Sequence, residues 1–290
     1  MRNVKARFSE GMQILKTVPD ARAACRKQKR PLGLVPTMGA LHEGHLSLVR
    51  AAKAQCQAVA VSIFVNPTQF GPTEDLSKYP RTFERDCELL EKEGVDLIFA
   101  PAAEEMYPAG ASTFVTVAGL SERLDGKSRP GHFRGVTTVV SKLFHIVEPD
   151  KAFFGQKDAA QVAVIRRMVR DLDLPIEIVV CPIVREPDGL AMSSRNVYLD
   201  PERRKTALVL SRSLRRIFET FEKGEKNSST LIATGKNVIA EEPDARLDYF
   251  EIVDPNTLEP VSEIQGPTLV AVAAYVGTTR LIDNVVLQLS

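Results

Sequence analysis

Short apolar runs recur along the first 185 residues and alternate with longer stretches in which apolar and charged positions are mixed. The runs are LGLV (32–35), AVAVSIFV (58–65), VDLIFAP (95–101), KAFFG (151–155) and IEIVVCPI (176–183). Continuous apolar runs of this length are typical of strands buried on both faces of a sheet. The stretches between and after them predict helices at about 44–56, 82–93, 136–147 and 159–171. Strands that alternate with helices predict an α/β fold, a Rossmann-like doubly wound parallel sheet.

The two ends of the chain have different patterns. Residues 10–30 have the spacing of an amphipathic helix, and Pro19 predicts a break within it. After Arg185, helical stretches precede three strand-like runs; the helices are expected at about 201–223 and 229–242, the strands at 247–254, 268–276 and 280–287. Helices followed by strands indicate an α+β organisation. The sequence therefore predicts two domains, a parallel-sheet domain at 1–185 and a smaller α+β domain at 186–290.

Composition narrows the class of protein. The chain has 290 residues, of which 44% are hydrophobic and 26% charged, as is ordinary for a soluble globular protein. Because 38 Lys and Arg face 37 Asp and Glu, a nucleic-acid partner is not expected. The four cysteines are scattered, which argues against a disulfide framework or a zinc site. Since no apolar run has membrane-spanning length and MRNVKARFSEGM lacks a signal-peptide core, we expect a cytoplasmic protein without a membrane partner.

The segment PTMGALHEGHL (36–46) follows the first apolar run of the predicted sheet. Ligands of open α/β sheets bind beyond the carboxyl ends of the strands. Gly39 and Gly44 permit close backbone approach, and a helix that begins near Gly44 directs N–H groups and a positive dipole end toward the ligand. His42 and His45 add further donors, so a phosphate chain fits. From the residues alone, two other uses remain open: a structural cap, or half of a metal site that needs a third ligand.

Two later segments carry similar chemistry. In FFGQKDAAQ (153–161), Gly155 permits close backbone approach, Lys157 suits a phosphate and Asp158 suits ribose hydroxyls. A plain strand-to-helix turn fits the same residues. GLAMSSRN (189–196) offers two hydroxyls and an arginine for a polyphosphate, although a surface linker has the same composition. Since all three segments follow strands of one sheet and supply phosphate-directed groups, together they favour a nucleotide site.

These motifs carry a resemblance to a family. PTMGALHEGHLSLV, IFVNPTQFGPTEDLSKYPRT, FFGQKDAAQ and REPDGLAMSSRNVYL closely resemble the pantoate–beta-alanine ligases, which belong to the nucleotidyltransferase superfamily of class I aminoacyl-tRNA synthetases. HEGH resembles the HIGH motif of that superfamily, and MSSRN stands in the place of its KMSKS loop. The resemblance is dense from about residue 32 to 200 and looser beyond. It implies ATP-dependent condensation of (R)-pantoate with beta-alanine through pantoyl adenylate, with release of pyrophosphate and AMP.

The resemblance also implies roles for individual residues. His45 takes the proton-donor role, and His42 and Lys157 join it as catalytic groups at the phosphates. The implied ATP-binding positions are Met38, Gly39, Ala40, Leu41, His42, Glu43, Gly44, His45, Gly155, Gln156, Lys157, Asp158, Val184, Met192, Ser193, Ser194 and Arg195. Gln156 stands where many relatives have an acidic residue, and its side chain is not expected to be essential.

Three further positions complete the implied site. By the resemblance, Gln69 and Gln161 match the pantoate-binding glutamines of the family. The chemistry suits this role, because a neutral amide can both donate to and accept from the two hydroxyls of pantoate. Asp86 matches an acidic position associated with Mg²⁺, which is otherwise held largely by phosphates and water. Arg129 and His132, in SRPGHF, are candidates for the same pocket but receive no role.

Two other functions are weighed against this one. Another nucleotidyltransferase of the superfamily needs cations for a phosphorylated substrate, where this chain offers Gln69 and Gln161. A non-catalytic nucleotide-binding module is disfavoured by the complete HEGH, GQKD and MSSR motifs. The family resemblance suggests a homodimer, for which STFVTV (112–117) is either an edge strand or part of an interface.

Overall fold

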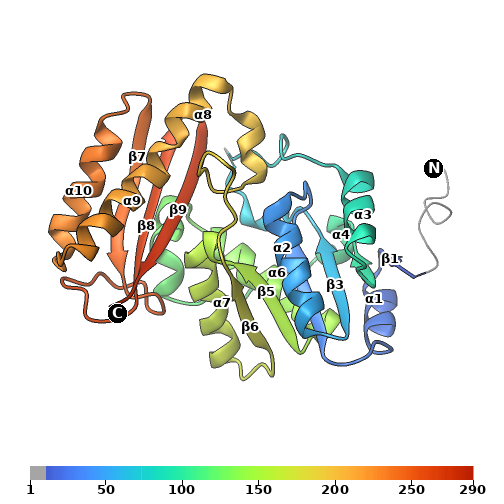
Figure 1. The fold of residues 1–290 in the computed structure, drawn as a ribbon. Helices are drawn as coiled ribbons and strands as arrows, with labels where there is room; N and C mark the ends of the chain where they lie inside the picture. Colours follow the sequence, from blue (N-terminus) through green and yellow to red (C-terminus); the bar gives the residue numbers. More distant parts are fainter. Residues whose placement is uncertain (1–10, 73, 290) are drawn as a thin grey trace. The chain divides into compact units, whose positions relative to one another are not determined.

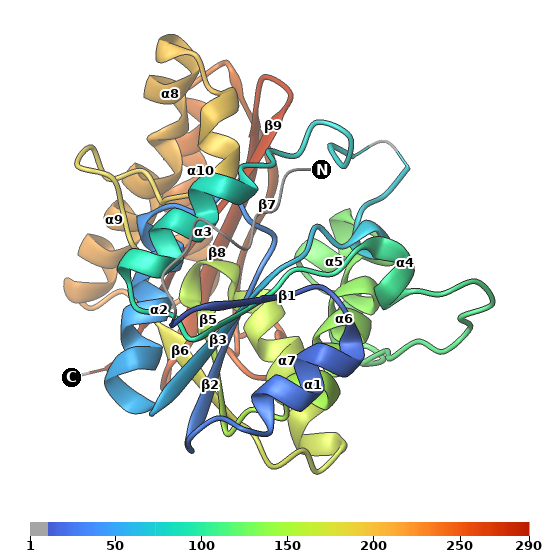
Figure 2. The same ribbon diagram turned by 90° about the vertical axis from the view of Figure 1, so that its right-hand side faces the viewer.

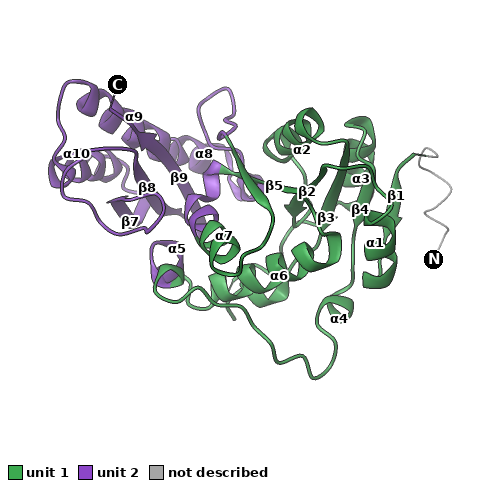
Figure 3. Ribbon diagram, turned by 90° about the horizontal axis from the view of Figure 1, so that it is seen from below, with its two compact units in different colours: residues 1–121, 129–155, 164–181 green, residues 122–128, 156–163, 182–290 purple. Residues whose placement is uncertain are grey.

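The computed structural model describes residues 11–72 and 74–289, which form two compact units (Figure 3). Unit 1 lies within residues 1–121, 129–155 and 164–181, and unit 2 within residues 122–128, 156–163 and 182–290. The short segments 122–128 and 156–163 thus group with the C-terminal part of the chain. The domain boundary expected between residues 185 and 186 stays a prediction.

Within the described residues, unit 1 is built on a six-stranded parallel sheet (Figure 1). Its strands are β1 (Gln13–Leu15), β2 (Leu32–Thr37), β3 (Ala58–Ile63), β4 (Leu97–Phe99), β5 (Lys151–Gly155) and β6 (Glu177–Cys181). The spatial order is β1-β4-β3-β2-β5-β6. The chain runs outward from β2 through β3 to β4 and then crosses to the other side of β2. The direction of winding therefore reverses between β2 and β5, which is where open α/β sheets bind ligands. The predicted doubly wound sheet is confirmed.

Helices cover both faces of this sheet (Figure 3). The helices that contribute to unit 1 are α1 (Val18–Cys25), α2 (Glu43–Gln55), α3 (Phe83–Lys92), α4 (Ala103–Met106), α6 (His132–Val147) and α7 (Ala159–Asp171). Helices α2 and α3 lie on one face, where Val49 and Leu90 pack with Val61 in a shared core. Helices α1 and α6 lie on the opposite face. None of the helices in the described part of the chain is long and apolar enough to cross a membrane.

The predicted helix over 10–30 is wrong in its first part. Gln13–Leu15 form the edge strand β1 beside β4 (Figure 2), and helix α1 begins only at Val18. Thr17 caps that helix by accepting a hydrogen bond from the Asp20 amide at 3.3 Å. Pro19 therefore lies in the first turn, where its missing N–H has no helical partner to lose, and it marks a helix start where a break was predicted. Residue 10 lies outside the described residues.

The segment 111–117 has no regular secondary structure, so the edge strand predicted at 112–117 is wrong. The backbone of Val115 is satisfied by a helix, because Val115 donates its N–H to Thr138 Oγ1 at 3.0 Å and accepts from Thr137 Oγ1 at 2.6 Å. Both threonines belong to α6. Side-chain hydroxyls thus take the place of a neighbouring strand. The alternative, part of an interface, stays a prediction.

Unit 2 contains a three-stranded antiparallel sheet in the order β7-β8-β9. The strands are β7 (Ala245–Val253), β8 (Thr268–Val276) and β9 (Thr279–Leu287), and the helices are α5 (Asp125–Ser128), α8 (Pro201–Ala207), α9 (Val209–Glu222) and α10 (Ser228–Ala240). Helices α9 and α10 form a core with the sheet, to which Ile217, Leu231 and Phe250 contribute. A Cβ at Gly235 would lie 2.4 Å from Cζ of Phe250, so the glycine permits α10 to approach β7 closely. The predicted α+β organisation is confirmed.

Candidate active site

The loop after β2 is held in place by one buried carboxylate. Gly39 and Ala40 both adopt left-handed backbone angles, with φ of 80° and 50°. Asp86, near the start of α3, is only 1% exposed and accepts from the amides of Ala40 and Leu41, each at 2.9 Å. It also accepts from Thr82 Oγ1 at 3.0 Å. These hydrogen bonds stabilise a conformation that a non-glycine residue such as Ala40 adopts rarely.

The two histidines cap helix α2. His42 is the N-cap residue, and its Nδ1 accepts from the Gly44 amide at 3.2 Å. His45 reaches back, so that its Nδ1 accepts from the His42 amide at 3.4 Å, and the two ring centroids lie 4.1 Å apart. Because both Nδ1 atoms accept, each neutral ring carries its proton on Nε2. A capping role and a donor role are therefore compatible in these two residues, and the helix end adds its own positive dipole.

The local geometry supports metal binding less than it supports the capping and donor roles of the two histidines. No group of three or more His, Cys, Asp or Glu side chains within residues 11–72 and 74–289 is arranged to hold a metal ion. A carboxylate has about four acceptor positions, and the described contacts of Asp86 use three of them. At most one remains, on Oδ2. A direct contact between Asp86 and Mg²⁺ stays a prediction. The cysteines of the chain, Cys25, Cys56, Cys87 and Cys181, are free.

Gln69 lies beside the loop that follows β2. It ends a short 3₁₀ helix, η2 (Pro67–Gln69), which Asn66 caps by accepting from the Thr68 amide. The buried Asn66 side chain also donates to Gln69 Oε1 at 3.1 Å, and Gln69 Nε2 contacts Met38 Sδ at 3.1 Å. The structure thus places the amide of Gln69 next to a residue of the β2 loop and fixes the orientation of that amide.

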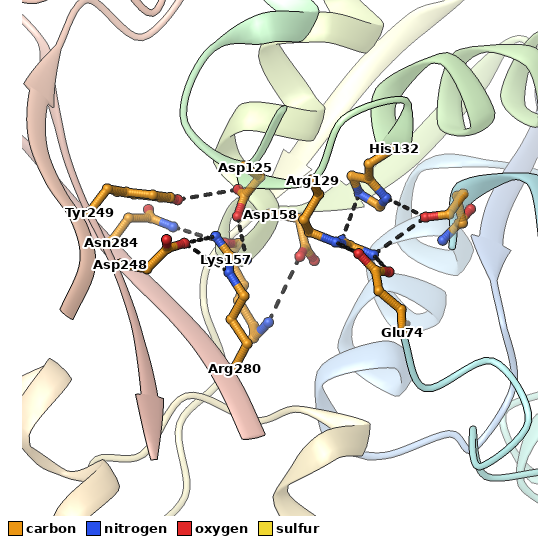
Figure 4. A network of polar contacts seen from close by, with 11 residues as sticks. Glu74, Asp125, Arg129, His132, Lys157, Asp158, Asp248, Tyr249, Arg280 and Asn284 are labelled. Carbon is orange, nitrogen blue, oxygen red and sulfur yellow. Dashed lines mark hydrogen bonds and ion pairs between the residues drawn. The ribbon is translucent and has the colours of Figure 1, made fainter. Parts of the chain in front are cut away.

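Arg129 and His132 contact the backbone carbonyl oxygen of Gln69. Figure 4 shows the two side chains next to each other, with Glu74 beside Arg129. His132 Nδ1 lies 2.8 Å from the Gln69 carbonyl oxygen, which can only accept, so Nδ1 carries the proton. His132 Nε2 then accepts from Arg129 Nη1 at 3.0 Å. Arg129 also binds Glu74 with two hydrogen bonds of 2.8 and 2.6 Å. Burial opposes the charge on Glu74, but the hydrogen bonds from Arg129 outweigh it and leave the pKa of this carboxyl below its ordinary value.

Sequence reasoning missed two residues that position Gln69. Asn66 donates to the Gly135 carbonyl oxygen as well as to Gln69, and so joins η2 to α6. A Cβ at Gly135 would lie 2.3 Å from the Thr68 carbonyl oxygen, so this helix approaches η2 only because the residue is glycine. Both had a signal: an Asn before Pro is a turn start, and a glycine inside a predicted helix often marks close packing.

The remaining predicted residues belong to unit 2, except Gly155, which ends β5 in unit 1. Gln156, Lys157 and Asp158 form a 3₁₀ helix, η4 (Gln156–Asp158), and Lys157 Nζ lies 3.8 Å from Asp158 Oδ1. Gln161 is half-buried on the first turn of α7.

Val184 and the MSSR segment are neighbours within unit 2. The amide of Met192 donates to the Val184 carbonyl oxygen at 3.0 Å, which closes a hairpin around residues 185–191. Ser193 then caps the 3₁₀ helix η5 (Ser194–Tyr198) by accepting from the Arg195 amide at 3.2 Å. Unit 2 therefore brings together Val184 and residues 192–195, while unit 1 brings together residues 38–45, Gln69 and Asp86.

Known proteins resemble this chain over nearly its whole length. The model of the Pantoate-beta-alanine ligase family matches residues 13–286. A pantothenate synthetase of Koribacter versatilis is 63% identical over 280 residues, which cover 96% of each chain. The crystal structure of pantothenate synthetase from Thermus thermophilus is 49% identical, with a TM-score of 0.91 and coverage of 94% of this chain and 99% of that one. A pantoate-beta-alanine ligase from Francisella tularensis, complexed with beta-gamma ATP and beta-alanine, is 34% identical, with a TM-score of 0.76 and coverage of 95% and 97%.

Proposed function

Because the chain belongs to the pantoate–beta-alanine ligase family, we propose that it joins (R)-pantoate to beta-alanine in two ATP-dependent steps. First, a carboxylate oxygen of pantoate attacks the α-phosphorus of ATP, which gives pantoyl adenylate and pyrophosphate. Second, the amine of beta-alanine attacks the acyl carbon, loses a proton and releases AMP. The observation that carries this proposal is the imidazole pair of His42 and His45 at the N-terminus of α2, at the carboxyl end of β2. Such a group of donors suits a polyphosphate.

The phosphates are assigned to two histidines and one lysine. In the proposed reaction His45 donates a proton or hydrogen bond to the phosphates, His42 assists it, and Lys157 supplies a positive charge. The assignment of the two histidines is supported by their Nδ1 contacts, which direct the ring protons to Nε2. The other proposed contacts to ATP come from residues 38–44, 155–158, Val184 and 192–195. Negative charge that develops on the phosphoryl oxygens and on the departing pyrophosphate would be stabilised by these groups.

Pantoate is assigned to Gln69 and Gln161. The proposal for Gln69 is supported by its fixed orientation, since Asn66 and Met38 contact its two amide atoms. A fixed amide can donate to one hydroxyl of pantoate and accept from the other. Because Arg129 and His132 contact the Gln69 carbonyl oxygen, we assign them to the positioning of this glutamine rather than to the substrate itself.

Mg²⁺ is proposed to bind together with ATP. Magnesium in nucleotide sites is held mainly by phosphates and water, with one or two carboxylates. The single acceptor position left on Asp86 Oδ2 fits one contact, either to the ion or to a water molecule bound to it. When bound, the ion would neutralise charge on the phosphates.

The proposed assembly is a homodimer in the cytoplasm, where ATP is available and thiols stay reduced. Phe114, in segment 111–117, is 51% exposed and offers an apolar contact to a second copy. Phe114→Ser should therefore weaken self-association in sedimentation velocity. A wild-type protein that sediments as a monomer at micromolar concentration contradicts the proposal.

Pyrophosphate exchange tests the proposed function. With pantoate and ATP but no amine, labelled pyrophosphate should be incorporated into ATP, because the first step is reversible and complete by itself. Exchange that requires beta-alanine contradicts the two-step scheme. Exchange that is absent under every condition contradicts catalysis altogether, as expected for a module that only binds nucleotide.

A further inference from the structure

Two adjacent polar residues in strand β9 are buried. Asp283 is 4% exposed and Asn284 is 3% exposed, in the sequence RLIDNVVL. Successive residues of a strand face opposite sides of a sheet. Asp283 lies on the same face of β9 as Leu281 and Leu287, which belong to the core shared with α9. Asn284 therefore faces the other side of the sheet. One dipeptide can therefore reach two different segments of unit 2.

Asn284 binds the segment that carries Lys157 (Figure 4). Its Nδ2 donates to the carbonyl oxygens of Gln156 and Lys157 at 2.9 and 3.0 Å. Its Oδ1 accepts from Gln156 Nε2 at 3.0 Å. Both amide hydrogens of Asn284 are used on backbone oxygens, so this side chain fixes the path of η4 and the point from which the Lys157 side chain starts. The Gln156 side chain contributes to the same contact.

Asp283 binds the base of the MSSR segment. Its carboxylate accepts from Arg185 Nη1 and Nη2 at 2.7 and 2.9 Å, and from the backbone N–H of Asn284 at 2.8 Å. Arg185 Nη1 also donates to the Gly189 carbonyl oxygen at 3.1 Å. The guanidinium thus links β9 to the hairpin that closes between Val184 and Met192. A two-hydrogen-bond contact of this kind fixes orientation as well as distance.

We propose that Asp283 and Asn284 are positioning residues for the nucleotide: together they hold the Lys157 segment and the Val184–Met192 hairpin in a fixed relation within unit 2. The inference rests on the proposed function, because that function assigns both segments to ATP. Groups that bind a reacting phosphate must be placed to within about 1 Å, and a shift of that size can cost about a hundredfold in rate. Neither residue needs to touch ATP for this role.

The variant Asn284→Asp gives the sharpest test. It keeps the size and shape of the side chain but replaces the donating amide with a carboxylate that faces two carbonyl oxygens. A role in filling space would survive this change, whereas a role in positioning would not. We expect KM for ATP to rise about ten- to a hundredfold, with KM for pantoate little changed, because a buried partner is left unsatisfied. Asn284→Ser, which keeps a donor, should recover part of the loss.

The second arm of the test is Asp283→Asn, with Arg185→Gln and the double variant. If Asp283 and Arg185 act through their contact with each other, the double variant should raise KM for ATP no more than the worse single variant does. Asp248→Asn is the matched control, because Asp248 also binds an arginine of β9, accepting from Arg280 Nε and Nη2 at 3.0 and 2.8 Å. It should lower Tm to a similar extent and leave KM for ATP unchanged.

The outcomes separate the inference from the proposed function. If Asn284→Asp folds and retains the wild-type KM for ATP, the inference is overturned. It is also overturned if KM for all three substrates rises in proportion to the loss of Tm, or if the control Asp248→Asn raises KM for ATP to the same extent. Should Asn284→Asp not fold, the same criteria apply to Asn284→Ser and Arg185→Gln. If wild-type protein shows no pyrophosphate exchange, the proposed function fails, and calorimetric titration with ATP alone still tests whether these variants weaken nucleotide binding selectively.

Discussion

The two units offer phosphate-directed groups but support them in different ways. In unit 1 the supports are partly local: His45 caps onto His42 three residues earlier, and Asn66 contacts Gln69 three residues later. In unit 2 the supports are distant, since Asn284 contacts a residue 128 positions away. The chemistry of a site can thus be concentrated in short motifs while the residues that hold it in place are spread along the chain. The difference predicts which substitutions act on a reacting group and which act on its support.

The largest effects should follow from removal of one phosphate-directed side chain in each unit. His45→Ala and Lys157→Ala should each slow adenylate formation by about 10²- to 10³-fold, because a preorganised donor to the phosphates is lost. Amide formation from supplied pantoyl adenylate should suffer less, since pyrophosphate has already left. Single-turnover kinetics on each step would measure the two penalties.

Matched controls exist for both variants. His145→Ala removes an exposed histidine whose Nδ1 contacts the Ser141 carbonyl oxygen, and Lys53→Ala removes an exposed lysine paired with Asp96. Neither should change the adenylation rate. Equal slowing of both steps in His45→Ala and Lys157→Ala, or adenylation at the wild-type rate, contradicts the phosphate assignment.

The next largest effect should come from the support of the β2 loop. Asp86→Asn replaces one acceptor with a donor that faces the amide of Ala40 or Leu41, so the free energy of unfolding should fall by about 1–3 kcal/mol. Urea denaturation measures this loss, and KM for ATP should rise with it. Asp96→Asn is the control, because Asp96 also accepts from a backbone amide, that of Val59 at 2.8 Å, and is not assigned to the site. Unchanged stability with a higher Mg²⁺ requirement would instead indicate a metal ligand.

The two glutamines assigned to pantoate lie in different units, Gln69 in unit 1 and Gln161 in unit 2. Gln69→Ala and Gln161→Ala should weaken pantoate binding by about 1–3 kcal/mol, roughly ten- to a hundredfold, while ATP binding changes little. Calorimetric titration with each ligand separates the two affinities. Gln28→Ala, which removes a contact to the Ala24 carbonyl oxygen in the turn after α1, should affect neither. Equal losses for pantoate and ATP mean that the glutamines shape the fold and do not bind the diol.

The smallest effect concerns the contact between Glu74 and Arg129. The pKa of Glu74 is lowered in the folded state, so its contribution to stability is present above its ordinary pKa of 4.5 and is lost as the pH falls through the lowered value. Glu74 is 23% exposed, and the contribution should be at most about 1 kcal/mol. Glu74→Gln should therefore lower Tm at pH 7, and its Tm should converge with that of wild type as the pH falls below the lowered pKa of Glu74. A constant difference across this range contradicts the assignment.

The fold was predictable because apolar runs identify strands wherever both faces of a sheet are buried. The same reasoning failed at the N-terminus, where β1 is a short edge strand that precedes Pro19 in the sequence. It also failed at 112–117, where threonines of α6 satisfy the backbone of Val115. Both errors depend on tertiary partners that no local pattern contains.

In the candidate site, too, some residues are indicated by local sequence patterns and others depend on tertiary partners. His42 and His45 lie in a motif whose residue types already favour phosphate binding, whereas Gln69 is indicated only by the resemblance to the family. Asp283 and Asn284 are two polar residues between apolar neighbours on β9, and nothing near them in the sequence indicates which residues they contact. Only the antiparallel sheet of unit 2 brings them to Arg185 and to the Lys157 segment.

In the proposed reaction the pantoate carboxylate itself attacks the α-phosphorus of ATP. This step can be followed with pantoate labelled with oxygen-18 in its carboxylate and mass spectrometry of the AMP formed in the presence of beta-alanine. One labelled oxygen should appear in AMP, because that oxygen leaves with the phosphoryl group when the amine attacks the acyl carbon. AMP without label, or label in the released pyrophosphate, would contradict an acyl adenylate and with it the roles proposed for both units.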